Sequence, residues 1–443
     1  MFKTLKNAWK TPELQKKMLF VLFIVLLYRL GACLCVPYVS ADVSGSFATA
    51  YGSSVLGLMS ILSGGALQYA TLFALSVNPY ITASIVIQLL TIAIPALERM
   101  SKDGPEGQKK INAITRYVTV ALSLVTSYGY SMLLKSNGWL VRSDWFAMIV
   151  INAAFCAGAA LVMWLAELIN DKGIGNGISI ILFANIISRI PSMVVSLYNS
   201  IVMNGSYHWA IGAVIALAII ALMVVIVGFV VFITNSERRI PIQYAKRVVG
   251  RKMYGGQSTN LPIKLNMAGV MPIIFASSIV SIPATITAFM NNHDNWFYKF
   301  VDNFFDTDTW EYLVVFLILI VAFSYFYIMI SFNPVEVANN INSNGGSIPG
   351  HRPGRPTVQY INRILKRITL LGAFFLCIVA GLPMLATVIT TAIQNARPTA
   401  NVVNLSGFTF GGSSLLIVVG VALETVRDIE AQLSLRANKG FLS

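Results

Sequence analysis

The chain has 443 residues, of which 56% are hydrophobic and only 11% are charged, and its mean hydropathy is +0.71. A soluble domain carries about 25% charged residues, and a membrane span needs about 20 apolar ones. Composition therefore excludes a soluble globular protein and predicts many membrane-spanning helices. The cysteines form no CxxC pair and are interpreted as small apolar side chains: Cys33, Cys35, Cys156 and Cys377.

The first apolar segment, residues 18–38, follows a basic tail. A cleaved signal peptide would share this arrangement, but the segment is long enough to span and no small-residue cleavage site follows it cleanly. We therefore expect a retained first span, preceded by a cytoplasmic tail over residues 1–17.

The next apolar region has no ionisable residue between Asp42 and Glu98, yet it is interrupted by Ser63-Gly64-Gly65 and by Asn78-Pro79. The piece near residues 53–67 is too short and too rich in Gly and Ser to span. Irregular backbone at membrane depth is tolerated only where protein buries it or where it lines a water-filled cavity. We expect a re-entrant helix that acts as a stopper, hinged at the two glycines. A surface re-entrant loop without a gating role is the alternative.

Ten apolar segments are expected to span the membrane. In chain order they are residues 18–38, 74–95, 114–135, 146–167, 176–200, 209–233, 267–290, 311–332, 367–388 and 409–427.

The basic residues predict the orientation of these spans. Of 32 Lys and Arg residues, 26 lie in the two tails and in the loops after even-numbered spans, and five lie in the other loops. Basic loops stay on the cytoplasmic side, so both termini are expected there. Ten spans divide into an N-terminal half, 18–200, and an oppositely oriented C-terminal half, 201–427, followed by a cytoplasmic tail, 428–443. Such inverted halves place a pathway at their interface.

The expected spans hold almost no ionisable chemistry. Arg29 is the one charge within a span, Glu167 and Glu424 lie near cytoplasmic ends, and the histidines lie in expected loops: His208, His293 and His351. Metalloprotease, phosphate-binding and serine-hydrolase motifs are absent from the sequence. We expect no catalytic residue, no metal site and no cofactor, and therefore no enzyme. A pathway lined by apolar side chains remains, and such a lining can seal a pore by dewetting.

Two long cytoplasmic loops, 235–266 and 333–367, carry clustered Arg and Lys. The simplest interpretation is charge that fixes topology, but long ordered loops are usually functional. Clustered arginines suit phosphate or carboxylate partners. Ribosomal RNA and an acidic motor protein both fit this charge.

The order of the motifs resembles the SecY/Sec61-alpha family, in its bacterial form, over essentially the whole chain. The matching pieces are "SGGALQYATLFAL", "NPYITASIVIQLLT", "GIGNGISIILFA", "ERRIPIQYAKRVVGR", "LPIKLNMAGVMPIIFASSI", "NPVEVANNI", "GSIPGHRPGRPT", "FGGSSLLIVVGVALETV" and "KGFL". The resemblance implies an all-α membrane protein with ten spans in two inverted five-helix halves and a plug helix at about 55–67. It also implies a channel that conducts unfolded secretory polypeptides across the membrane and releases transmembrane segments sideways into lipid.

The resemblance assigns roles to individual residues. The pore ring would comprise Val77, Ile81, Ile178, Leu182, Ile274 and Ile417. The plug would comprise Leu56, Leu58, Met59, Ile61, Leu62, Gly64 and Gly65. The lateral gate, between the second and third spans and the seventh and eighth, would include Gln88, Asn266, Ser277 and Ser278. Contacts with the ribosome or the SecA motor would come from Arg247, Arg251, Lys252, Arg352 and Arg355.

The implied partners are the SecE and SecG subunits, the SecA motor ATPase, the ribosome, signal sequences and nascent polypeptides, YidC and SecDF, and membrane lipids. The implied location is the bacterial plasma membrane. The chain departs from the family pattern at Asn78 and His351, where apolar residues are usual, and at Val77 and Leu182, where isoleucine is usual. These departures put the tightness of the seal in doubt.

Two other classes compete with this interpretation. A ten-span secondary transporter of a small solute would need an intramembrane binding residue, for which only Arg29 is available. A membrane scaffold would need neither a pathway nor a hinged plug.

Overall fold

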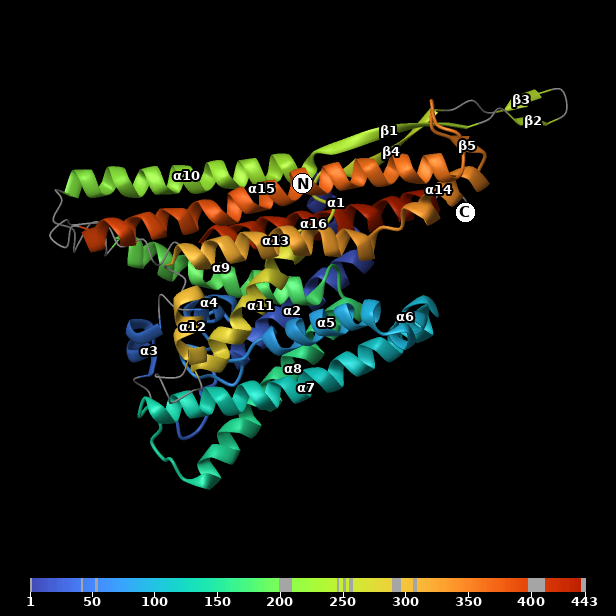
Figure 1. Cartoon of the computed structure of the whole chain (residues 1–443). Helices are drawn as coiled ribbons and strands as arrows, with labels where there is room; N and C mark the ends of the chain where they lie inside the picture. The colour runs from blue at the N-terminus through green and yellow to red at the C-terminus, as the bar shows by residue number, and fades with distance from the viewer. Residues whose placement is uncertain are drawn as a thin grey trace.

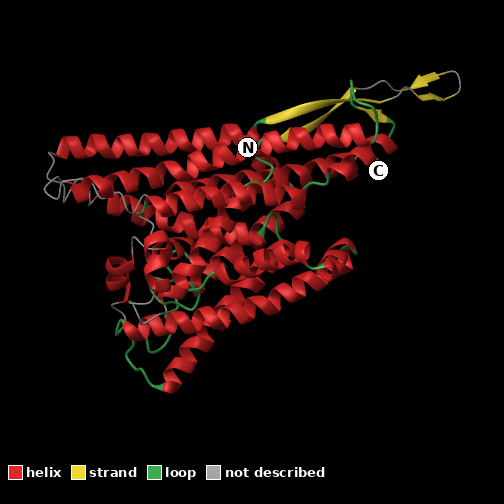
Figure 2. Ribbon diagram, in the orientation of Figure 1, coloured by secondary structure: helices red, strands yellow, loops and turns green. Residues whose placement is uncertain are grey.

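The computed structural model describes residues 2–40, 43–51, 55–198, 209–244, 247–249, 252–254, 258–288, 296–305, 309–396 and 411–439. Helices dominate these residues, and the short strands gather at one end of the molecule (Figure 2). The helices before residue 200 are α1 (Phe2–Trp9), α2 (Pro12–Gly31), α3 (Val43–Tyr51), α4 (Val55–Leu62), α5 (Asn78–Ala93), α6 (Pro95–Lys102), α7 (Pro105–Ser136), α8 (Trp145–Lys172) and α9 (Gly177–Tyr198). The later helices are α10 (Trp209–Asn235), α11 (Met271–Ala288), α12 (Trp296–Phe305), α13 (Trp310–Ser331), α14 (Pro334–Ser343), α15 (Arg355–Ala396) and α16 (Gly411–Lys439).

The helices form two groups with a shared centre. Figure 1 shows α5, α7 and α8 on one side of the molecule and α10, α13, α15 and α16 on the other. Between them lie α4, α9 and α11, and α4 contacts both α9 and α11. Helices from both halves of the sequence therefore meet around α4. The inverted relation of the halves stays a prediction.

A helix covers each of the ten segments that were expected to span. Among the described residues, four stretches are long and apolar enough to cross a membrane: Pro105–Ser136, Trp145–Lys172, Trp310–Ser343 and Arg355–Ala386. The pair α5 and α6, bent by 102° at its break, raises the number to five. The mostly helical membrane fold is confirmed, and the expected count of ten spans is not.

Two prolines define α5. Pro79 lies in its first turn, where the missing N–H group would have no helical partner in any case. Pro95 follows its end, and Ile94 has the extended values φ −108° and ψ 113° that a residue before proline prefers. Asn78-Pro79 therefore marks the start of a helix, and the helix ends on the far side where the chain bends into α6.

Small polar residues let α7 pack closely on its neighbours. A row of buried hydroxyl side chains follows one face at four-residue spacing: Thr115, Thr119, Ser123, Ser127 and Ser131. The Ser123 hydroxyl lies 3.1 Å from the Sγ of Cys156 on α8. Small residues allow membrane helices to approach each other, which explains how α7 packs along both α5 and α8.

The two long cytoplasmic loops share a small β-sheet that the sequence analysis did not expect. It contains β1 (Glu237–Tyr244), β4 (Ser258–Lys264) and β5 (Gly346–Ser347) in the antiparallel order β4-β1-β5. Ile240 and Ile242 alternate with exposed residues and pack, with Ile263, on apolar residues of α14 and α15. A separate hairpin, β2 (Arg247–Val249) and β3 (Lys252–Tyr254), extends beyond this sheet (Figure 1).

Candidate pore and plug

The six residues assigned to the pore ring belong to the large apolar cluster between the halves. Val77, Ile81, Leu182, Ile274 and Ile417 are almost fully buried in it, and Ile178 packs against it. They come from the start of α5, from α9, from α11 and from α16, two helices of each half. None of these side chains can form a hydrogen bond with water or an ion, so the cluster has the chemistry of a dry constriction.

The helix assigned as the plug is α4. Leu56 is buried in a second apolar cluster with Leu67 and Tyr130, and Met59 packs against it. Leu62, at the end of α4, packs against the large cluster that holds the ring residues. Ile61 is half-buried, and the Leu58 side chain lies outside the described part of the molecule. The plug helix therefore bridges the two clusters.

The chain reverses directly after α4 at two glycines in the left-handed region, Gly64 with φ +68° and Gly65 with φ +89°. A Cβ atom at Gly64 would lie 2.9 Å from Nη1 of Arg29 and 2.9 Å from Oδ1 of Asn185. Other residue types rarely adopt this conformation, and this site has no room for a side chain. The expected hinge is therefore a backbone feature that needs glycine.

A polar network that the sequence analysis missed holds the end of α4. The Nδ2 of Asn185 on α9 donates to the Leu62 carbonyl oxygen at 2.9 Å and to the Tyr28 hydroxyl at 2.9 Å. It also lies 3.3 Å from Oγ of Ser76, and the Tyr28 and Ser76 hydroxyls are 3.1 Å apart. Arg29 donates from Nη2 to the Ala184 carbonyl oxygen at 3.0 Å. One amide thus ties α2, α4, α9 and the start of α5 together.

A second cation lies one helical turn further along α9. Arg189 donates from Nη1 to Oγ of Ser60 at 3.2 Å and from Nη2 to Oε1 of Gln68 at 3.1 Å. The sequence analysis searched the spans only for ionisable residues and placed Arg189 in an external loop. A lone carboxamide in the apolar run "IILFANII" was the signal for Asn185, because polar groups inside a membrane are costly and usually functional.

The residues assigned to the lateral gate are only partly brought together. Gln88 lies on α5, and Ser277 and Ser278 lie on α11, a helix that contacts α5. Both serine hydroxyls donate to the Ile274 carbonyl oxygen, at 2.9 and 2.8 Å. Asn266 precedes α11 instead, and its Nδ2 donates to the Gly269 carbonyl oxygen at 3.1 Å.

An apolar cavity of about 310 Å³ opens between α4, α5, α7 and α11. Its walls include Met59 of the plug, Thr82 of α5, Leu122 of α7 and Ile282 of α11. The sequence analysis named the helices of the gate correctly by order, but it did not identify these lining residues apart from Met59. An apolar cavity bordered by both plug and gate helices suits an apolar peptide segment.

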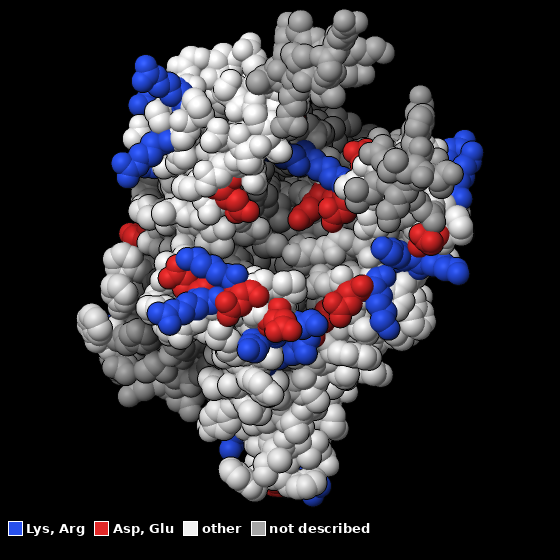
Figure 3. Space-filling view, turned by 90° about the vertical axis from the view of Figure 1, so that its right-hand side faces the viewer, with Lys and Arg blue, Asp and Glu red and all other residues white. Residues whose placement is uncertain are grey.

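The strand-bearing end of the molecule is hollowed and ringed by charges of both signs (Figure 3). A cavity of about 270 Å³ beside α16 is lined by Lys264, Asn266, Arg427 and Asp428, among others. Arg427 donates from Nη2 to the Thr234 carbonyl oxygen at 2.7 Å. Burial lowers the pKa of Lys264, and the neighbouring Arg427 lowers it further. Burial raises the pKa of Asp428, partly offset by Lys264.

The basic residues assigned to ribosome or motor contacts lie on two separate structures. Arg247 and Lys252 belong to β2 and β3, and Arg251 lies outside the described residues. The side chain of Arg352 is exposed, and so is that of Arg355, the first residue of α15. His351 stacks on Tyr360 with the ring centroids 4.1 Å apart, which gives a packing reason for its departure from the family pattern.

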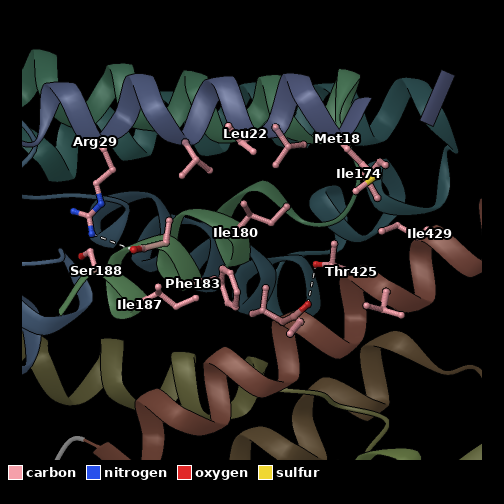
Figure 4. A pocket seen from close by; sticks show the side chains of 16 residues that line it. Met18, Leu22, Arg29, Ile174, Ile180, Phe183, Ile187, Ser188, Thr425 and Ile429 are labelled. Carbon is pink, nitrogen blue, oxygen red and sulfur yellow. Dashed lines mark hydrogen bonds between the residues drawn. The ribbon is translucent and has the colours of Figure 1, made fainter. Parts of the chain in front are cut away.

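A larger apolar groove, about 580 Å³, lies between α2, α9 and α16. Figure 4 shows Leu22, Ile180, Phe183 and Ile429 along it, with Arg29 and Ser188 at one end. Within the described ranges, no three His, Cys, Asp or Glu side chains are placed to hold a metal ion.

A model of the SecY family matches residues 71–426 of this sequence. The protein translocase subunit SecY of Streptomyces scabiei is 42% identical over 454 residues, covering 100% of each chain, and that of Streptomyces coelicolor is 43% identical with the same coverage. The chain belongs to the SecY family of protein translocation channels.

Solved structures with the same fold agree with this assignment. One, described as "The plug domain of the SecY protein stablizes the closed state of the translocation channel and maintains a membrane seal", has a TM-score of 0.61 at 17% identity, covering 94% of this chain and 91% of that one. Sec61 in a canine ribosome–channel complex has a TM-score of 0.59 at 15% identity, with the same coverage. These findings support a translocation channel and give no support to a solute transporter.

Proposed function

We propose that this SecY-family chain passes unfolded secretory polypeptides through the apolar cluster between its halves. The constriction would be formed by Val77, Ile81, Ile178, Leu182, Ile274 and Ile417, with α4 as the stopper. The observation that carries the proposal is the position of α4, which contacts α9 of one half and α11 of the other beside the ring residues. Displacing one short helix would open a path there without unfolding a span.

Sideways release of apolar segments would occur between α5 and α7 on one side and α11 and α13 on the other. Burial of apolar surface favours transfer into lipid by about 25 cal/mol per Å². A sufficiently apolar helix would therefore leave through the gate, and a polar segment would continue across. The cavity beside Thr82 and Ile282 supports this route, because it already presents an apolar wall between the gate helices.

The work of transport would come from partners, since the channel itself would hydrolyse nothing. The proposed partners are SecE and SecG in the membrane, SecA or the ribosome at the cytoplasmic loops, and YidC and SecDF during insertion and export. The exposed Arg352 and Arg355 suit an acidic or phosphate-bearing surface. The proposed location is the bacterial plasma membrane with both termini in the cytoplasm, as the distribution of Lys and Arg indicates.

Reconstitution tests this function. The chain would be incorporated with SecE and SecG into liposomes and supplied with SecA, ATP and a radiolabelled secretory precursor. We expect ATP-dependent protection of the precursor from added protease. A preparation that never protects the precursor, yet takes up a small solute saturably, would favour the transporter alternative and overturn the proposal.

A further inference from the structure

The bonds that hold α4 divide into two sets at the glycine hinge. On the plug side of Gly64, α9 holds the Leu62 carbonyl oxygen through Asn185 and the Ser60 hydroxyl through Arg189. On the far side of the hinge, the Tyr130 hydroxyl donates to the Leu67 carbonyl oxygen at 2.5 Å. Movement of α4 about the hinge leaves the bond to Leu67 intact and breaks the two bonds on the plug side.

Asn185 and Arg189 are four residues apart and therefore lie on one face of α9. Arg189 also holds Gln68 beyond the hinge, so its guanidinium spans the hinge in the closed arrangement. The Oδ1 of Asn185 is buried and has no hydrogen-bond partner among the described residues. Its Nδ2 atom, by contrast, meets three acceptors, so the donors of this amide determine its orientation.

We propose that Asn185 and Arg189 are positioning residues that latch the plug closed through the Leu62 carbonyl oxygen and the Ser60 hydroxyl. The proposal rests on the function proposed above, in which α4 is the stopper. Buried polar groups that lose their partners pay a desolvation cost, so the closed arrangement is favoured as long as these groups have no replacement. A passing polypeptide or water in the opened funnel supplies new partners, which makes the latch reversible.

The latch makes the closed channel sensitive to single polar substitutions. Asn185→Leu keeps the approximate volume of the side chain but removes both N–H donors. A net hydrogen bond shifts an equilibrium by roughly fivefold to tenfold, and we expect the open fraction of the resting channel to rise by about that factor. Tyr28→Phe leaves the Leu62 bond and the stacking of the ring on Phe73 in place, so we expect a smaller rise, about twofold.

The experiment uses the full chain in planar bilayers and in liposomes. Basal conductance is recorded for the unchanged chain, Asn185→Leu, Arg189→Leu, Tyr28→Phe and a deletion of Leu56 to Leu67. Plug displacement is followed separately by the labelling of Leu56→Cys with an impermeant maleimide, after the four native cysteines are replaced by serine. Leu56 is buried in the closed arrangement, so labelling reports its release.

Asn152→Leu is the matched control, because Asn152 on α8 also has a buried side-chain oxygen without a partner among the described residues. The latch is supported if Asn185→Leu and Arg189→Leu raise both conductance and labelling while Asn152→Leu changes neither. It is overturned if the deletion conducts but the two latch variants, and Tyr28→Phe if they fail to fold, stay as silent and as slowly labelled as the unchanged chain. A silent deletion would instead remove the stopper itself and the function built on it.

Discussion

Ile81 and Ile274 face each other across the two halves as members of one apolar cluster. Replacing both with glycine removes two branched side chains from the proposed constriction and leaves space that water can enter. We predict that the closed channel then leaks ions, measured as conductance in planar bilayers.

Helix weakening by glycine is controlled with Ile85→Gly and Ile273→Gly. Both residues are buried in the same cluster, on α5 and α11, but were not assigned to the ring. Equal conductance in the two double variants would show that the ring assignment has no special meaning.

Asp428 gives a pH-dependent prediction. Burial raises its pKa above the ordinary value of 3.8, so the folded protein bears a cost for the carboxylate at neutral pH. That cost falls as pH decreases through the raised pKa, and it vanishes below 3.8, where the folded and unfolded states are both protonated. We predict that Asp428→Asn raises the Tm in detergent at pH 7 and that this advantage shrinks as the pH is lowered. A constant difference between pH 7 and pH 4 would contradict the assignment.

Individual residues differed in how far the sequence could predict them. The hinge at Gly64 and Gly65 followed from an interrupted apolar run, because few other features place two glycines there. Asn185 and Arg189 could not be assigned in advance, since their roles depend on which backbone atoms α9 meets in space. The six ring residues rested on a family resemblance, and the structure adds that they share one cluster.

Helix packing sets the second scale. Gly158 of α8 approaches the loop after the hinge so closely that a Cβ atom there would lie 1.9 Å from the Leu72 carbonyl oxygen. Backbone must move to accept any side chain, and overpacking of this kind costs about 1–3 kcal/mol. We predict that Gly158→Ala lowers the Tm in detergent.

Gly228→Ala on α10 is the matched control, because nothing lies within 4 Å of a Cβ atom there. Alanine stabilises a helix interior relative to glycine by about 0.5–1 kcal/mol, so the control should keep or raise the Tm. A Gly158→Ala protein as stable as the control would show that α8 and the loop tolerate separation.

The exposed loop before α15 gives a functional prediction at the same scale. Arg352→Glu reverses the charge of a side chain that is exposed to solvent, so we predict loss of motor-driven secretion with normal insertion and folding. Arg142→Glu is the control, because Arg142 is equally exposed on the side expected to be external and pairs only loosely with Asp144 at 3.6 Å. Normal secretion by Arg352→Glu would remove this residue from the proposed motor contact.

The ten helix positions were predictable because each apolar run is long, and apolar length is a strong signal in a membrane protein. The sheet in the cytoplasmic loops was not predicted. Ile240 and Ile242 do alternate, but the loop is short and basic, and β1 is completed by β5, which lies about a hundred residues later. Pairing between such distant segments leaves no local pattern.

At the scale of the whole molecule, the two halves meet around α4, and the plug belongs to both. Its start packs with Tyr130 in one cluster, its end packs with the ring cluster, and its last carbonyl oxygen is bound by Asn185. This arrangement explains why an apolar run long enough to span is interrupted: one part blocks the funnel, and the part after Asn78-Pro79 forms α5.

Single-channel conductance in planar bilayers tests this account most directly, with the intact chain compared with a deletion of Leu56 to Leu67. The account predicts a silent intact chain and a flickering, ion-conducting deletion with little preference among ions, because an apolar lining coordinates none of them. Two silent proteins, or two proteins that both conduct one chosen ion, would contradict the claim that α4 closes a polypeptide-conducting pore.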